Sequence, residues 1–100
     1  MIYTLTKVVA AAGTAEPLSS TKLMVDWAEI KALKASGAAN TGNIYVGTSS
    51  TAAAATGYPL TSGQTLVLQP LTGKTYIDLS LVYIDAGTSA DAVKVIYGRG

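Results

Sequence analysis

The sequence predicts an all-β fold, a small two-sheet β-sandwich or jelly-roll-like domain of about seven or eight strands. Short apolar runs recur at spacings of roughly ten residues, and stretches rich in Gly, Ser, Thr, Asn and Pro separate them. Within several runs apolar and polar residues alternate, as in strands with one buried face. The chain of 100 residues has the length of one domain, so we expect residues 1–100 to fold as a single unit.

The N-terminal part of the chain begins with a strand. Residues 2–9 alternate between apolar and polar side chains, which predicts a strand. Residues 15–19 predict a second, shorter strand that is interrupted by Pro17. Because proline has no N–H to donate to a ladder, we expect this strand at a sheet edge or in an irregular segment.

Residues 22–34 are compatible with either a helix or a strand. Asp26 and Glu29 have the spacing of a helix-capping pair, and apolar residues at helical spacing follow them. The same residues also alternate as a strand would, with a change of register near Trp27 that a β-bulge would explain. The alternating apolar set is Ala28, Ile30 and Ala32. We expect a strand, because the neighbouring segments all predict strands.

The second half of the chain supplies the remaining strands. Residues 43–47 form a clear strand pattern, and residues 48–57 contain only Thr, Ser, Ala and a closing Gly. This composition predicts a mobile loop that becomes ordered against a partner. Residues 86–91 predict a hairpin loop into the last strand. The other strands are expected at residues 58–60, 64–69, 75–79, 81–85 and 93–97, where 75–79 and 81–85 are either two strands or one bent strand.

The composition indicates a protein that is not an enzyme. The chain has no His and no Cys, which removes the usual general base, thiol nucleophiles and the commonest metal ligands. Glycine-rich phosphate-binding motifs are also absent from the sequence. We therefore expect no catalytic residues, no cofactor and no metal.

Three aspartates are the remaining candidates for chemistry. Asp78 and Asp85 flank a strand-rich segment, and Asp91 lies across a turn from Asp85. We expect Asp85 and Asp91 to cap backbone amides at the two ends of that turn. A calcium site in the same loop is the alternative, although the spacing lacks the dense acidic pattern of a calcium-binding loop.

The aromatic residues allow two interpretations. Several tyrosines fall inside predicted strands, where we expect them to pack at a sheet edge or at a subunit contact. The alternative is that they stack on carbohydrate. These tyrosines are Tyr45, Tyr76, Tyr83 and Tyr97.

Charge and hydropathy indicate a protein that binds or builds. Seven Lys and Arg against six Asp and Glu give a net charge of +1, without runs of like charge, so we expect no nucleic-acid partner. Only 13% of the residues are charged, which suits a subunit covered by neighbours better than a free monomer. The sequence shows neither a secretory leader nor an apolar run that would span a bilayer, so we expect no membrane partner.

Three segments resemble small β-rich virion structural proteins of tailed bacteriophages. Residues 40–47 read N-T-G-N-I-Y-V-G, and residues 57–68 and 78–97 continue the pattern of strands and turns. The resemblance covers the second half of the chain well and the first half loosely. It implies a β-sandwich in the phage head or tail, above all a capsid decoration (cement) protein, and it carries over no functional residues.

The first hypothesis is therefore a decoration protein that binds the outer capsid and stabilises the head. We expect a homotrimer that is made in the host cytoplasm, resides on the phage head and contacts the major capsid protein or other virion proteins. The alternative is a tail, neck or fibre module that binds host glycans through exposed tyrosines. The expected interface residues are Tyr3, Thr48, Ser49, Ser50, Thr51, Tyr58 and Arg99.

Overall fold

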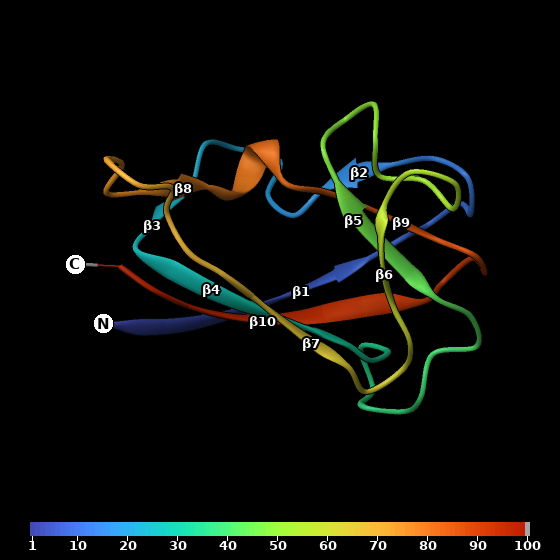
Figure 1. Cartoon of the computed structure of the whole chain (residues 1–100). Helices are drawn as coiled ribbons and strands as arrows, with labels where there is room; N and C mark the ends of the chain where they lie inside the picture. Colours follow the sequence, from blue (N-terminus) through green and yellow to red (C-terminus); the bar gives the residue numbers. More distant parts are fainter. Residues whose placement is uncertain (100) are drawn as a thin grey trace.

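A computed structural model describes residues 1–99 as an antiparallel β protein, which confirms the predicted fold class (Figure 1). This part of the chain contains ten strands and one short 3-10 helix. The strands β2, β3 and β8 span only two residues each, which leaves seven longer strands. The elements are β1 (Ile2–Val8), β2 (Glu16–Pro17), β3 (Met24–Val25), β4 (Trp27–Ala32), β5 (Ile44–Gly47), β6 (Tyr58–Leu60), β7 (Thr65–Leu68), β8 (Ile77–Asp78), η1 (Leu79–Leu81), β9 (Tyr83–Ala86) and β10 (Ala92–Gly98).

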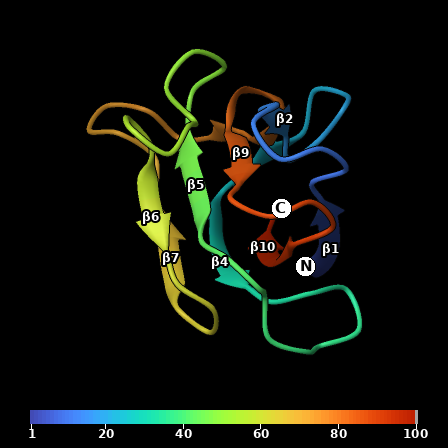
Figure 2. The same cartoon turned by 90° about the vertical axis from the view of Figure 1, so that its right-hand side faces the viewer.

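Two four-stranded sheets form the sandwich (Figures 1 and 2). The first sheet has the strand order β1-β10-β4-β7, and the second has the order β2-β9-β5-β6. The short strands β3 and β8 pair separately. In the first sheet the pairing of β1 with β10 is the longest, from Ile2 opposite Gly98 to Val8 opposite Ala92.

The core lies between the two sheets and follows from the alternation in the sequence. Every second residue of β4 is fully buried, and the inward-facing residues of β5 and β9 in the second sheet are also buried. Each fully buried aliphatic side chain contributes roughly 1.5–3 kcal/mol relative to an exposed one. The fully buried members include Val25, Ala28, Ile30, Ile44, Leu79, Ile84 and Val93.

The ambiguous segment at residues 22–34 is a strand interrupted at one residue. β3 pairs with β8, whereas β4 pairs with β10 and β7, so the chain changes partners at Asp26. The Asp26 N–H donates to the carbonyl of Gly98 at 2.8 Å. The change of register that the sequence placed near Trp27 therefore marks a transfer between sheets, one residue earlier.

The predicted hairpin at residues 86–91 is wrong. β9 belongs to the second sheet and β10 to the first, so residues 87–91 cross from one sheet to the other. The loop closes on the end of β1 instead: Ala90 N donates to Val9 O, and Val9 N donates to Asp91 O, both at 2.9 Å. Sequence signals of a turn do not distinguish a hairpin from a crossover, since both need the same turn residues.

The two strands predicted at residues 75–79 and 81–85 are shorter than expected. The chain forms β8, then η1, then β9. Asp78 begins η1 because its Oδ1 accepts hydrogen bonds from Ser80 N at 3.0 Å and Ser80 Oγ at 2.7 Å. A capping aspartate followed by a serine therefore converts the middle of this segment to one helical turn.

Candidate docking surface

The side of the first sheet that faces away from the core is named here the outer face. The strand register places its side chains in rows across the sheet. The rows are Ile2, Gly98 and Trp27; then Thr4, Ile96, Glu29 and Val67; then Thr6, Lys94, Lys31 and Thr65, with Val8 beyond Thr6 on β1.

Apolar side chains on the outer face remain open to solvent. Five of them are between 36% and 63% exposed: Ile2, Val8, Trp27, Val67 and Ile96. Single exposed apolar residues are common, but several on one face of one sheet mark a site of interaction. The few charges among them, Glu29, Lys31 and Lys94, are of both signs.

A shallow depression of 330 Å³ lies in the middle of this face. Short threonine side chains of β1 form one side, and longer side chains of β4 and β10 form the other. Its lining comprises Thr4, Leu5, Thr6, Glu29, Lys31, Lys94, Val95 and Ile96. The outer face therefore offers both apolar contact area and a recess for a side chain of a partner.

The indole of Trp27 lies against Gly98 of the neighbouring strand. A Cβ built on Gly98 would overlap the indole ring and would lie 2.8 Å from its Cε2 atom. Glycine is required at this position because the aromatic ring covers the backbone directly. The protein has one tryptophan, so this contact fixes the only indole of the chain at the outer face.

β1 forms a free edge of the first sheet (Figure 2). Met1 N donates to Arg99 O at 3.2 Å, Arg99 N donates to Met1 O at 3.1 Å, and Val9 N donates to Asp91 O. In an antiparallel ladder the paired residues alternate, so the odd-numbered residues of β1 bond to β10. The N–H and C=O groups that point away from the sheet belong to Ile2, Thr4, Thr6 and Val8.

The other sheet edges carry features that discourage pairing. β2 contains Pro17, β6 contains Pro59, and β7 has only four residues. The edge position of β2 agrees with the prediction made from Pro17. β1 has seven residues, without proline, and its one charged residue is Lys7. Natural proteins protect edges with proline, lysine or short strands, so β1 is the least protected edge.

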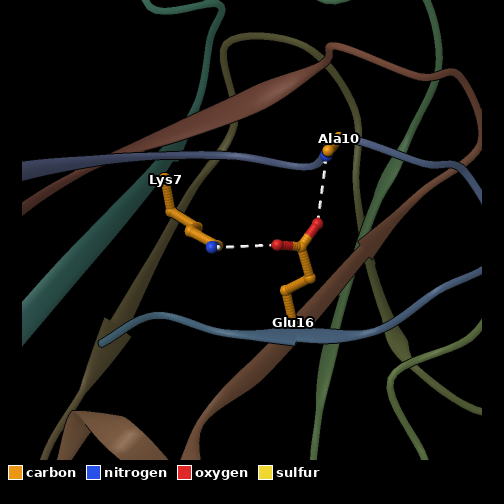
Figure 3. A network of polar contacts seen from close by, with 3 residues as sticks. All are labelled: Lys7, Ala10 and Glu16. Atoms are coloured by element: carbon orange, nitrogen blue, oxygen red, sulfur yellow. Dashed lines mark hydrogen bonds and ion pairs between the residues drawn. The ribbon is translucent and has the colours of Figure 1, made fainter. Parts of the chain in front are cut away.

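Lys7 does not protect the edge of β1 against pairing, because an ion pair holds its side chain on the core side of the sheet (Figure 3). Its Nζ atom lies 3.0 Å from Oε1 of Glu16, and Oε2 of Glu16 accepts a hydrogen bond from Ala10 N at 3.0 Å. These bonds, from Lys7 first and Ala10 second, hold the pKa of the Glu16 carboxyl below its usual value. The pair also links β1 to β2 and thus one sheet to the other.

The structure divides the sequence-predicted interface residues between two places. Tyr3 and Arg99 lie beside the chain termini, and the Tyr3 ring stacks on Tyr97 with centroids 5.5 Å apart. Thr48, Ser49, Ser50, Thr51 and Tyr58 lie in or next to the loop between β5 and β6, far from the termini (Figure 1). The N-terminal segment forms β1 already in the single chain.

The loop of residues 48–57 folds back on β5. Thr48 N donates to Thr51 Oγ1 at 2.8 Å, and Gly57 N donates to Ala53 O at 2.7 Å. Ala52 is buried, and a Cβ on Gly57 would lie 2.8 Å from the Cβ of Tyr45, on the outer side of the second sheet. The loop therefore covers part of that sheet, while Thr48, Ser49, Ser50 and Thr51 remain exposed.

The aspartates accept hydrogen bonds from backbone amides, as predicted for Asp85 and Asp91, but most donors come from distant loops. Asp85 Oδ1 accepts from Gly13 N at 3.0 Å and from Ala86 N at 2.8 Å. Hydrogen bonds from Ser80 first, and then from Leu23 N, hold the pKa of Asp78 below its usual value. Groups of three or more metal-binding side chains are absent from residues 1–99.

Two of the three segments that carry the resemblance, residues 40–47 and 78–97, meet around Asp91. Its Oδ1 accepts from Thr41 N at 2.9 Å, and its Oδ2 accepts from Gly42 N at 2.7 Å. The side-chain amide of Asn40 bonds to both backbone groups of Ala92, at 2.9 and 3.1 Å. These motif residues are thus structural, because they fasten the loop between β4 and β5 to the start of β10.

A Ser-x-x-Lys spacing and the exposed tyrosines are the remaining sequence features with a possible chemistry. Ser19 and Lys22 have the Ser-x-x-Lys spacing of some hydrolases, but the Ser19 hydroxyl donates to Thr21 O at 2.7 Å within a turn. Tyr76 precedes β8 rather than lying in a strand, contrary to the prediction, and Tyr58 belongs to β6 on a different part of the surface (Figure 1). The exposed tyrosines therefore do not form one stacking platform.

Sequence reasoning missed the outer-face residues Trp27, Val67 and Ile96. The available signal was an apolar residue at the polar phase of an alternating strand, as Val67 is between Leu66 and Leu68.

Comparisons with protein-family models, curated proteins and solved structures found no match to the chain. Across residues 1–99 the structure contains no helix of the length and apolarity needed to cross a membrane.

Proposed function

We propose that this protein is a non-enzymatic structural protein of a bacteriophage virion that binds the outer capsid as a decoration protein. The single observation that supports the proposal best is the outer face of the first sheet, where exposed apolar residues of four strands share one rigid surface. A surface with few charges and several exposed aliphatic residues gains free energy when a partner covers it.

The rest of the molecule is consistent with a structural role. Asp78, Asp85 and Asp91 each accept hydrogen bonds from the backbone, so their charges serve the fold. On a shell that repeats the same contact many times, modest individual contacts add up to firm attachment. Docking through the outer face would leave the loop of residues 48–57 free for a second contact.

The test uses Trp27 as an intrinsic reporter. Expanded empty capsids are mixed with the protein, and the amount that sediments with the shell is measured together with the Trp27 emission. We expect saturable occupancy in proportion to capsid subunits and a blue shift of the emission as the outer face loses water. Absence of binding by the native chain would contradict the proposal.

A pair of variants locates the contact. Val67→Lys combined with Ile96→Lys places two charges on the outer face, and we expect it to abolish capsid binding. Leu81→Lys is the matched control, because Leu81 is 68% exposed but lies on η1, away from the outer face. Equal loss of binding in both variants would show that the outer face is not the contact. Purified tails in the same assay separate the decoration protein from the tail, neck or fibre alternative.

A further inference from the structure

We propose that β1 pairs with β1 of a second copy of this chain, antiparallel and about a two-fold axis at Leu5, to form a symmetric dimer. The pairing would join the two first sheets into one continuous sheet of eight strands, four from each copy. This inference goes beyond capsid binding, since it concerns the chain alone and holds whatever assembly the dimer joins.

The hydrogen-bonding pattern of β1 permits this pairing. Ile2, Thr4, Thr6 and Val8 all direct their N–H and C=O groups away from β10. When Leu5 lies on the axis, Ile2 faces Val8 of the second copy and Thr4 faces Thr6 of the second copy. The four resulting residue pairs form about eight hydrogen bonds, two for each closely spaced pair of an antiparallel ladder.

The side chains are complementary in the same register. On the outer face all four residues of β1 are β-branched, and they pair as Ile with Val and Thr with Thr, combinations that stabilise antiparallel strands. On the core side Leu5 meets Leu5 of the second copy. Lys7 faces Tyr3 of the second copy rather than another lysine, so the one charge of β1 meets no like charge.

Other arrangements of the same strand lose contacts. Moving the axis to Thr4 or Thr6 leaves three closely spaced pairs instead of four and separates Ile2 from Val8. Parallel pairing is less stable per residue, and it would shift the two identical strands by an odd number of residues, which breaks the two-fold symmetry. The centred antiparallel register is therefore the one that uses the whole edge and stops at two copies.

The dimer would also present a larger docking surface. Facing side chains of paired strands lie on the same side of a sheet, so the outer faces of both copies would become one surface. Trp27 lies on β4, two strands from the edge, and its emission would report docking rather than pairing. The inference departs from the expected homotrimer, because antiparallel pairing of identical strands generates a two-fold axis.

A charge-reversal pair tests both the partner and the register, with sedimentation equilibrium as the measurement. Thr4→Glu with Thr6→Glu places glutamates opposite each other in the two central pairs, and we expect dimer affinity to fall by at least about tenfold. Thr4→Lys with Thr6→Glu places opposite charges there, and we expect a dimer. In both variants the acid at position 6 lies beside Lys94 of its own chain, so the two differ only at position 4.

A second pair tests the edge itself. Thr6→Pro removes an outward N–H of β1 without removing an internal hydrogen bond, and we expect it to yield monomers. Thr65→Pro is the control at the opposite edge of the same sheet: Ala32 N donates to Gln64 O at 3.0 Å, so the N–H of Thr65 also points outward. We expect this variant to remain a dimer.

Several results would overturn the proposal. The first is a native chain that is monomeric at about 1 mM, a concentration far above that needed for specific dimers. The second is a trimer that persists in the Thr6→Pro variant. The third is a monomeric variant that combines Thr4→Lys with Thr6→Glu. A native monomer whose capsid binding is lost with Thr6→Pro but kept with Thr65→Pro would assign the edge to a strand of the capsid instead.

Discussion

The two sheets of this sandwich contain four strands each and share one core. They differ on their outer sides, because loops cover the second sheet but leave the first sheet exposed. In the second sheet Asp85 lies on the outer side and is nevertheless buried, because the loop that contains Gly13 covers it. The loop of residues 48–57 packs against Tyr45 on the same side. In the first sheet Val67 and Ile96 stand in the equivalent outward positions and remain exposed.

The edges differ in the same direction. The edge strands of the second sheet are short and contain Pro17 and Pro59, whereas β1 of the first sheet is long and has no proline. A small domain has little surface to spare for its own stability. The second sheet is thus closed by the chain itself, whereas the first leaves its outer side and its β1 edge open, as the proposed docking and pairing require.

The largest expected effect concerns the point where the two sheets are joined. Asp91 is fully buried and holds the amides of Thr41 and Gly42 in the connection between β4 and β5. Asp91→Ala leaves both amides without acceptors, and we expect the free energy of unfolding to fall by about 3 kcal/mol. Urea unfolding followed by circular dichroism measures the change.

Asp91→Asn is the control for that prediction. One amide oxygen remains to accept a hydrogen bond, so we expect a smaller loss, about 1.5 kcal/mol. Equal stability of the wild type and Asp91→Ala would show that the joint between the sheets does not depend on this carboxylate.

The second prediction compares acids on the outer sides of the two sheets. Asp85 of β9 accepts two backbone hydrogen bonds and is buried, and we expect Asp85→Ala to cost about 2 kcal/mol. Glu29 of β4 is half-buried, and its carboxylate accepts no hydrogen bond within residues 1–99. We expect Glu29→Ala to change the stability by less than about 0.5 kcal/mol. Similar losses in thermal unfolding would remove the contrast between a covered and an uncovered sheet.

Local patterns in the sequence predicted the elements of the fold. The alternation in residues 28–32 predicted the buried side of β4, and Pro17 correctly marked an edge strand. Both signals are local, since they depend on side-chain period and on the missing N–H of proline. The strand at residues 22–34 was correctly preferred to a helix on the basis of its neighbours.

Long-range partners could not be predicted in the same way. The crossover at residues 87–91 depends on which strands pair, and the bond from Gly13 to Asp85 joins a loop to a strand 72 residues away. The outer face was missed because Trp27 and Val67 look like core residues until the register places them on the solvent side. Pairing of strands is decided by the whole core, so local sequence carries little of this information.

The smallest expected effect concerns the ion pair that crosses between the sheets. The pKa of Glu16 is lowered in the folded protein, chiefly by the hydrogen bond from Lys7, so folding favours its charged form. A carboxyl with a lowered folded pKa stabilises the protein above its unfolded pKa of about 4.3, and this contribution is lost as the pH falls through the folded pKa. Stability should therefore decrease from about pH 5 downwards.

Replacement of either partner should flatten this decrease. A partly exposed pair contributes only about 0.5 kcal/mol at neutral pH, so the measurement is a set of urea midpoints from pH 7 to about pH 3. We expect Glu16→Gln to reduce the acid-side slope most and Lys7→Met to reduce it less, because the hydrogen bond from Ala10 N still lowers the pKa of Glu16 in that variant. Some slope should persist in both, because Asp78 has a lowered pKa from Ser80 and responds to acid in the same direction. A slope that both replacements leave unchanged would show that Glu16 does not hold the Lys7 side chain. Lys7 would then be available to protect the edge of β1 against pairing with another strand.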